Sequence, residues 1–147
     1  MKLRLVFLGK TRGAEYRALI EDYVARIRHF NPIEVVEKKS TQAGPEVLEA
    51  ARGQGGRGVA AVLLDVAGKN FTSEEFAAWL QKQLNSGKQE LVFLLGGAEG
   101  FPEETRKQAS ELLSLSKMTL PHELARVVLV EQLYRGFSIL NHHPYSK

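Results

Sequence analysis

The sequence predicts a single α/β domain in which a mainly parallel sheet is flanked by helices. Short apolar runs alternate along the whole chain with segments whose apolar residues recur at helical spacing. Residues 59–64 and 91–95 are apolar at every position, as in strands that are buried on both faces of a sheet. A length of 147 residues fits one domain that spans residues 1–147.

The first half of the chain contains three expected strands and two expected helices. A glycine or a charged residue follows each apolar run, and helical spacing appears between the runs, as at Tyr16, Ile20 and Ile27. Pro45 suits the first position of a helix, which ends in a glycine cluster. The expected strands are residues 3–8, 33–36 and 59–64, and the expected helices are residues 16–27 and 45–52.

The second half continues the same alternation. Thr72 and Glu75 have the spacing of a capping box, in which each side chain bonds the backbone N–H of the other residue. Pro102 precedes two acidic residues, which the dipole favours in the first turn of a helix. The expected elements are a helix from Thr72 through Leu84, a strand at residues 91–95, a helix from Pro102, and a last helix from Pro121 to about Leu140.

Composition excludes several classes of function. The chain has no cysteine, so disulfides, thiolate metal sites and cysteine nucleophiles are excluded. Its four histidines show no HxxxH or HExxH spacing, and we therefore expect no metal. No apolar run approaches the roughly 20 residues of a membrane helix, and charged residues interrupt the N-terminal run, so a cytoplasmic protein is expected. A net charge of +3 permits nucleic-acid binding without requiring it.

Two glycine-containing segments follow expected strands, but neither has the spacing of a nucleotide-binding motif. Gly9-Lys10-Thr11 lacks the earlier glycine of a phosphate-binding loop. Residues 96–100 read GGAEG, which is not the GxGxxG of a dinucleotide site. These glycines either let the backbone approach a ligand or simply make a tight turn. Ligands bind at the carboxyl ends of parallel strands, so the loops after Leu64, Leu95 and Met118-Thr119 are the expected ligand loops.

Residues 115–121 form a segment that mixes apolar and hydroxyl side chains. Such a loop is expected to be partly buried, with backbone groups that need partners. An adenine ring between leucine side chains would supply them. The alternative interpretation is a short buried strand.

The last helix is apolar on more than one face, and a single sheet cannot cover all of its apolar residues. We therefore expect a second copy of the chain, that is, a homodimer. Glu131 and Arg135 are four residues apart, so they either pair with each other or contact a substrate. His122 and the pair His142-His143 bracket this helix, which suggests an anionic substrate.

Taken together and in order, four segments of the chain resemble the RlmH-like ribosomal large-subunit pseudouridine N3-methyltransferases of the SPOUT superfamily. The segments are Leu63-Leu64-Asp65 with Gly68-Lys69, residues 95–100, residues 115–122 and residues 126–135. The resemblance covers the whole chain, and it implies a deep C-terminal trefoil knot, a homodimer and S-adenosylmethionine as the methyl donor. The implied substrate is pseudouridine 1915 of 23S rRNA, methylated at N3 in the assembled ribosome.

The resemblance also implies positions for the site. The cofactor-binding residues would be Leu64, Gly96, Leu115, Ser116, Lys117, Met118, Thr119 and Leu120. N3 of pseudouridine must lose a proton during attack, so a base is needed, either His122 or a water near Glu131 and Arg135. The expected RNA contacts are Arg126, His142, His143 and Tyr145.

The C-terminus departs from the family pattern. Family members commonly end in a Tyr-His pair, whereas this chain ends Pro144-Tyr145-Ser146-Lys147. The role of a terminal histidine would therefore pass to His142, His143 or Ser146, or be dispensable. Two alternatives remain open: another SPOUT enzyme that methylates tRNA, and a non-catalytic RNA-binding assembly factor. A nucleotide-binding oxidoreductase is disfavoured because of the glycine spacing.

Overall fold

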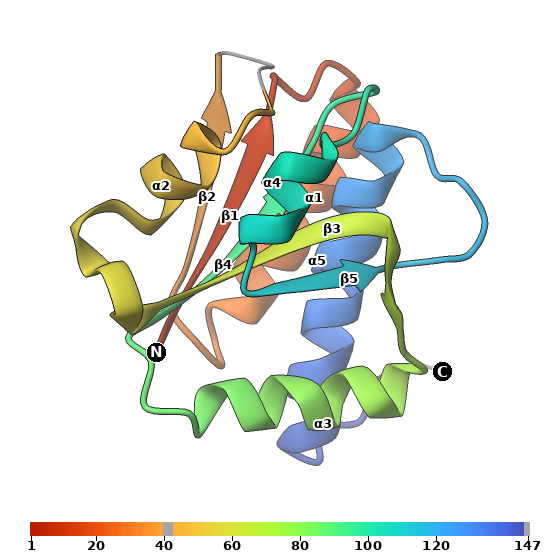
Figure 1. Cartoon of the computed structure of the whole chain (residues 1–147). Helices are drawn as coiled ribbons and strands as arrows, with labels where there is room; N and C mark the ends of the chain where they lie inside the picture. The colour runs from red at the N-terminus through yellow and green to blue at the C-terminus, as the bar shows by residue number, and fades with distance from the viewer. Residues whose placement is uncertain (40–42, 146–147) are drawn as a thin grey trace.

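A five-stranded, fully parallel sheet forms the centre of the molecule (Figure 1). The computed structural model describes residues 1–39 and 43–145. The strand order is β2-β1-β4-β3-β5, so β4 is the central strand, and the two runs predicted to be fully apolar, residues 59–64 and 91–95, lie in the neighbouring strands β3 and β4. The strands are β1 (Lys2–Leu8), β2 (Ile33–Lys38), β3 (Val59–Asn70), β4 (Glu90–Leu95) and β5 (Glu111–Ser114).

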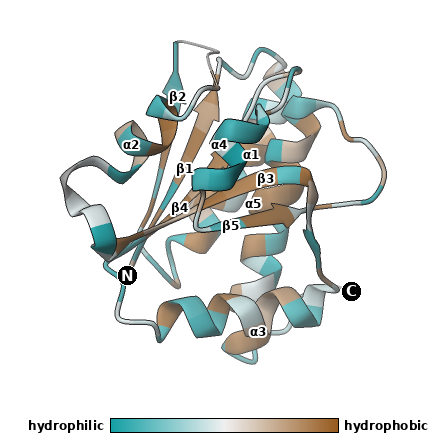
Figure 2. Ribbon diagram, in the orientation of Figure 1, coloured by the Kyte–Doolittle hydropathy of each residue, from teal (hydrophilic) through white to brown (hydrophobic). Residues whose placement is uncertain are grey.

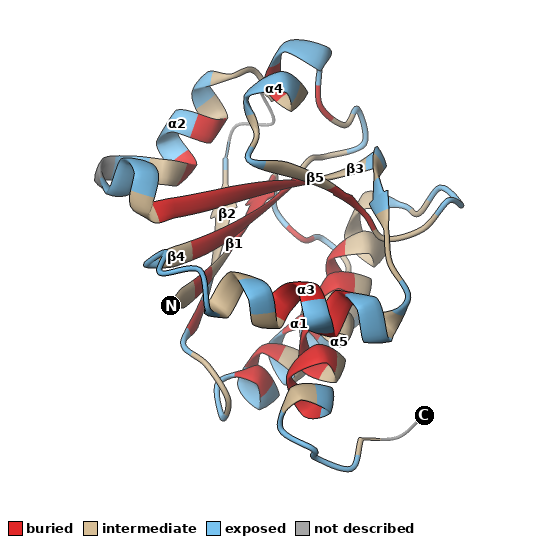
Figure 3. Cartoon of the chain, turned by 60° about the horizontal axis from the view of Figure 1, so that its bottom comes forward, coloured by how far each residue is buried: buried red, intermediate tan, exposed pale blue. Residues whose placement is uncertain are grey.

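Helices cover both faces of the sheet, which gives three layers (Figure 3). The helices of one face are α1 (Ala14–Ile27), α3 (Ser73–Leu84) and α5 (His122–Leu140). The short helices of the other face are α2 (Glu46–Arg52) and α4 (Glu103–Gln108), and a 3₁₀ segment (Gly53–Gly58) leads from α2 into β3. The capping box of Thr72 and Glu75 at the start of α3 is confirmed, with both of its hydrogen bonds present.

The apolar side chains form one cluster on each side of the sheet. Side chains alternate between the two faces of a strand, so Leu5 and Phe93 belong to one cluster while Val6 and Leu94 belong to the other. All four are buried. Figure 2 shows the consequence, an apolar sheet between helices whose outer sides are hydrophilic. The prediction of strands buried on both faces is therefore confirmed.

The apolar faces of α5 are covered within one chain. The helix packs against α1 on one side and α3 on another, with the sheet beneath it. Leu129, Val130, Leu133 and Phe137 are buried, whereas Ile139 is exposed. The apolar residues of α5 therefore give no reason to expect a second copy, because two neighbouring helices already cover them.

The third strand is longer than expected, and the fifth strand was not predicted. β3 continues past Leu64 to Asn70, where Lys69 and Asn70 pair with β5 after an irregularity in the register. Gly68 lies in this irregular part and against the backbone of β5. β5 has only four residues, and such a short run has no periodicity that distinguishes it from a loop.

Among the described residues, every helix is too short or too polar to span a bilayer. The same residues contain no group of three or more histidine and carboxylate side chains that could hold a metal ion.

Candidate functional site

A cleft of about 340 Å³ lies at the carboxyl ends of β3, β4 and β5. Parallel strands end at the same edge of a sheet, so three loops that are far apart in the sequence meet there. The volume is in the range of small-ligand sites, and leucine side chains and glycine backbone share the walls. The lining residues fall in residues 64–66, 95–100, 114–116, 118–120, 122 and 125.

The loop after β4 presents its backbone to the cleft. It folds back on itself, with the N–H of Gly100 donating to the carbonyl of Gly97 at 3.1 Å, and Gly100 has a φ of 70°, in the left-handed region that favours glycine. A Cβ at Gly96 would lie 3.3 Å from the carbonyl oxygen of Gly100. The glycines therefore make a tight turn, as the second interpretation expects, and the loop that they form lines the cleft.

The loop after β5 is ordered by its own serines. The hydroxyl of Ser114 donates to the carbonyl of Ser116 at 2.9 Å, and the hydroxyl of Ser116 accepts from the N–H of Met118 at 2.9 Å. Met118 lies on the rim of the cleft with 78% of its surface exposed, which is unusual for a large apolar side chain.

The structure brings the predicted cofactor residues together, with one exception. Leu64, Gly96 and five of the six residues of the 115–120 segment line the cleft. The sixth, Lys117, is exposed and does not line it. Lys117 precedes Met118 on the outer side of the loop, where a side chain faces solvent.

Three titratable side chains line the cleft, namely His122, Asp65 and Glu99. His122 begins α5, and its Nε2 lies 3.9 Å from a carboxylate oxygen of Glu123. Asp65 ends the apolar run of β3, and its side chain is only 7% exposed. Its carboxylate accepts from the N–H of Ala67 at 2.9 Å and lies 3.6 Å from Arg106. No role for Asp65 was predicted, although its place at the end of a buried strand was a signal that could have found it.

Arg126 is fully buried, and this corrects its assignment as an RNA contact. Its guanidinium donates to the hydroxyl of Thr11 at 2.8 Å and to the carbonyl of Leu8 at 3.0 Å, and it lies over the ring of Phe7. Burial lowers the pKa of Arg126, while the neighbouring Glu37 acts in the opposite direction. A side chain held under β1 in this way does not reach a phosphate on the surface.

Glu131 and Arg135 pair with each other, at 2.9 Å, and not with the cleft. They lie nine and thirteen residues after His122, which is about 14 and 20 Å along a helix. The hydroxyl of Tyr145 donates to Glu131 at 3.3 Å and lies 3.1 Å from that of Tyr23. Burial is the largest of the causes that raise the pKa of Tyr145, followed by the bond to Tyr23. Within one chain, this pair anchors the C-terminal segment and is not part of the cleft.

The remaining predicted RNA contacts lie beyond the end of α5. His142 and His143 are exposed, and the ring of His143 meets that of Phe30 edge-on at 5.9 Å. His142 has a φ of 53°, so the chain turns sharply there. The 19 residues of α5 span about 28 Å, which separates these histidines from the cleft of the same chain. Ser146 lies outside the described residues.

Comparison with known proteins gives matches over nearly the whole chain. A family model described as "Predicted SPOUT methyltransferase" matches residues 1–146. A protein of Citrifermentans bemidjiense named Ribosomal RNA large subunit methyltransferase H is 44% identical, over 99% of this chain and 98% of that protein. A protein of the same name from Koribacter versatilis is 43% identical, over 99% and 97%.

A solved structure shares the fold. It is described as a probable methylase family protein from Haemophilus influenzae, and it superimposes with a TM-score of 0.56 over 99% of this chain and 70% of that one. The sequence identity is 10%, so this likeness concerns the arrangement of strands and helices alone.

Proposed function

The chain belongs to the SPOUT methyltransferase family, and from this premise we propose that it methylates N3 of pseudouridine 1915 in the 23S rRNA of assembled ribosomes, with S-adenosylmethionine as methyl donor. The observation that carries the proposal is the cleft at the carboxyl ends of β3, β4 and β5. The cleft gathers the residues at which the family resemblance expects the cofactor. The relatives named as large-subunit rRNA methyltransferases support the choice of substrate.

The residues of the cleft fit S-adenosylmethionine. Leu64, Leu95, Leu115 and Leu120 provide apolar walls for a purine ring. The backbone of the loops after β4 and β5 provides donors and acceptors, and a Cβ at Gly96 would crowd the first of these loops. Asp65 adds a negative charge beside a ligand that carries a sulfonium and an ammonium group. When bound, this cofactor supplies an electrophilic methyl group.

We assign to His122 the role of the base that accepts the proton of N3. It is the imidazole among the residues that line the cleft, and a base must stand within hydrogen-bond reach of the proton that it accepts. Glu131 and Arg135 lie too far along α5 for this role within one chain, so we assign them to the anchoring of Tyr145. A target base inside an rRNA loop must leave its stack to enter the cleft, and holding it in line with the methyl group supplies much of the rate.

We also propose a homodimer, a C-terminal trefoil knot and a cytoplasmic location. The dimer rests on the family resemblance, and if His142 and His143 contact the RNA at a cleft, that cleft belongs to a second copy, because α5 separates them from the cleft of their own chain. Family membership supports the knot. Sedimentation velocity tests the dimer: a single species of monomer mass at micromolar concentration would contradict it.

The experiment that tests the function measures methyl transfer and cofactor binding together. Purified protein is incubated with radiolabelled S-adenosylmethionine and either ribosomes that lack this methyl group or unmodified tRNA, and the labelled nucleoside is identified by mass spectrometry. We expect transfer to the pseudouridine of 23S rRNA. Transfer to tRNA alone would instead show another SPOUT activity, and the absence of cofactor binding in calorimetry would show an RNA-binding factor.

A matched pair of variants ties the activity to the cleft. Gly96→Val places a branched side chain where a Cβ already meets Gly100 at 3.3 Å, so we expect a loss of cofactor affinity of more than about tenfold, or 1.4 kcal/mol. Gly58→Val is the control, because a Cβ there meets only the side chain of Gln89, at 3.7 Å, at the opposite edge of the sheet. Equal affinity in both variants would place the cofactor elsewhere.

A further inference from the structure

The loop between β1 and α1 carries two cations beside the cleft, and the proposed function gives them no role. We propose that Lys10 and Arg12 bind phosphates of the RNA substrate and hold it over the cleft. This inference rests on the proposed function, which it deepens by naming the surface that receives the RNA backbone.

The loop lies next to the cleft. β1 and β4 are neighbours in the sheet, so their loops leave the same edge side by side. A Cβ at Gly97, in the loop that forms one wall of the cleft, would lie 3.6 Å from the carbonyl oxygen of Leu8. The N–H groups of Arg12 and Gly13 both donate to Glu123 at 2.9 Å, and Glu123 follows His122 on α5. The loop is therefore adjacent to the proposed base.

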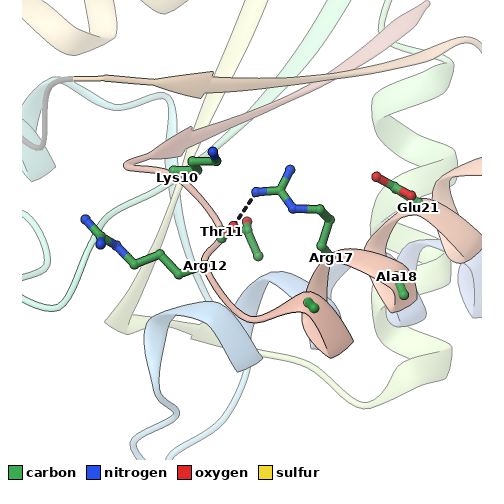
Figure 4. A pocket seen from close by; sticks show the side chains of 7 residues that line it. Lys10, Thr11, Arg12, Arg17, Ala18 and Glu21 are labelled. Carbon is green, nitrogen blue, oxygen red and sulfur yellow. Dashed lines mark hydrogen bonds between the residues drawn. The ribbon is translucent and has the colours of Figure 1, made fainter.

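The backbone of the loop is held in one conformation from several directions. Arg126 bonds the side chain of Thr11 from within the core, and Arg17 bonds its carbonyl (Figure 4). The N–H of Thr11 donates to Glu37. Burial alone would raise the pKa of Glu37. The hydrogen bonds from Thr11 and the nearby charges of Arg17 and Arg126 lower this pKa, so the carboxylate stays charged. A rigid loop that presents side chains to solvent is a suitable base for substrate contacts, because little order must be gained on binding.

Lys10 and Arg12 are exposed and uncompensated. Among residues 1–39 and 43–145, neither side chain forms a hydrogen bond or an ion pair. Arg17 differs, because it turns back to Thr11 and lies 3.8 Å from Glu37. Arg12, in contrast, points away from Arg17 and Thr11 (Figure 4). The cations border an open hollow of about 600 Å³ whose one acidic member is Glu21. The surface is therefore positive and free to bind an anion.

The chemistry points to RNA phosphates as the anion. S-adenosylmethionine contains no phosphate, so the cofactor does not need these cations. The loop is also no phosphate cradle, since the N–H groups of Thr11, Arg12 and Gly13 are already bonded to carboxylates. Lysine and arginine side chains at the edge of an active site, with no internal partner, are the groups that contact a nucleic-acid backbone.

The test measures the binding of ribosomes as a function of salt for a double variant, Lys10→Gln with Arg12→Gln. Each phosphate contact contributes about 0.7 (single strand) to 0.9 (duplex) to the slope of log affinity against log salt, so the slope should fall by about 1.4 to 1.8. At about 0.1 M salt this corresponds to a loss of affinity of about 25- to 60-fold. The affinity for S-adenosylmethionine should stay within about twofold of the wild type, since the cleft is not altered.

The control variant removes the same charge from the opposite edge of the sheet. Arg57, which precedes β3, and Lys82, near the end of α3, are exposed there, and Arg57→Gln with Lys82→Gln should keep the wild-type slope. Equal slopes in the two double variants would overturn the inference while leaving the methyltransferase activity of the wild type intact. Loss of cofactor binding in the first variant would also overturn it, because the loop would then act through the cleft. A wild-type chain that bound no ribosome would overturn both the inference and the proposed function.

Discussion

Gly68 is the position where the smallest change of side chain should have a large effect on stability. A Cβ at Gly68 would lie 2.6 Å from the carbonyl carbon of Leu112 and 2.6 Å from the nitrogen of Leu113, both in the backbone of β5. Ordinary contacts begin near 3.4 Å, so Gly68→Ala requires one strand to move by about 0.8 Å. Strand backbone cannot rotate away as a flexible side chain can.

Two routes for this adjustment give the same magnitude. Keeping the strands paired and overpacked costs about 1–3 kcal/mol. Separating them instead releases the pairs Lys69–Leu113 and Asn70–Ser114, at about 0.5–1.5 kcal/mol for each hydrogen bond lost. We therefore expect Gly68→Ala to lower the free energy of unfolding by about 1–3 kcal/mol, which for a chain of this size is about 2–4 °C in Tm per kcal/mol.

Trp79 offers a direct probe for this measurement. It is the single tryptophan of the chain, it is 7% exposed, and its ring stacks on that of Phe76. Its fluorescence during urea denaturation gives the free energy of unfolding for each variant. Gly58→Ala is the control, with only a side-chain contact at 3.7 Å, and it should stay within about 0.5 kcal/mol of the wild type. If the two alanine variants were equally stable, the close approach of β3 to β5 would be refuted.

Three further predictions concern single hydrogen-bonding groups. Thr72→Ala removes the cap of α3 and should cost about 0.5–2 kcal/mol in urea denaturation, whereas restoration by serine should recover most of the loss. Tyr145→Phe removes the hydroxyl bonds to α1 and Glu131 but keeps the ring, so a loss of about 0.5–1.5 kcal/mol is expected, and an unchanged Tm would show that the ring alone anchors the tail. Bonds from two backbone N–H groups, the larger from Gly13, lower the pKa of Glu123 below its usual 4.5. Because the pKa of Glu123 is lower in the folded chain than in the unfolded chain, this carboxylate stabilises the fold at pH values above its unfolded pKa. The stabilisation is lost as the pH falls through the folded pKa. On acidification from pH 6 to about pH 3, the wild type should therefore lose more stability than Glu123→Gln.

Local pattern predicted those parts of the fold that depend on local physics. The apolar runs of β1 and β4, the capping box of α3 and the proline before α5 are each visible within a few residues. β5 is different, because its four residues become a strand only by pairing with residues of β3 that lie 44 to 49 positions earlier. The cover of α5 is likewise set by tertiary packing, since its apolar residues show only that several faces are buried and not by what.

The candidate site, too, could be predicted where it depends on local sequence and not where it depends on tertiary packing. The loops that line the cleft could be predicted because the carboxyl ends of parallel strands must meet at one edge. Arg126 could not be placed, since arginine is rarely fully buried and its partners lie at the far end of the sequence. The pairing of Glu131 with Arg135 was one of two open alternatives, and the distance along α5 decides between them.

The contact between Arg126 and the loop after β1 has a consequence for the order of events during synthesis. Its partners Thr11 and Leu8 are made first, and Arg126 follows 115 residues after Thr11. Until α5 has left the ribosome, α1 lacks the helix that it packs against, and the loop that carries Lys10 lacks its bonds to Arg126 and Glu123. Contacts of such high sequence separation form slowly. This part of the fold must therefore wait for α5, and the surface that we assign to ribosomal RNA takes its shape only when that helix is in place.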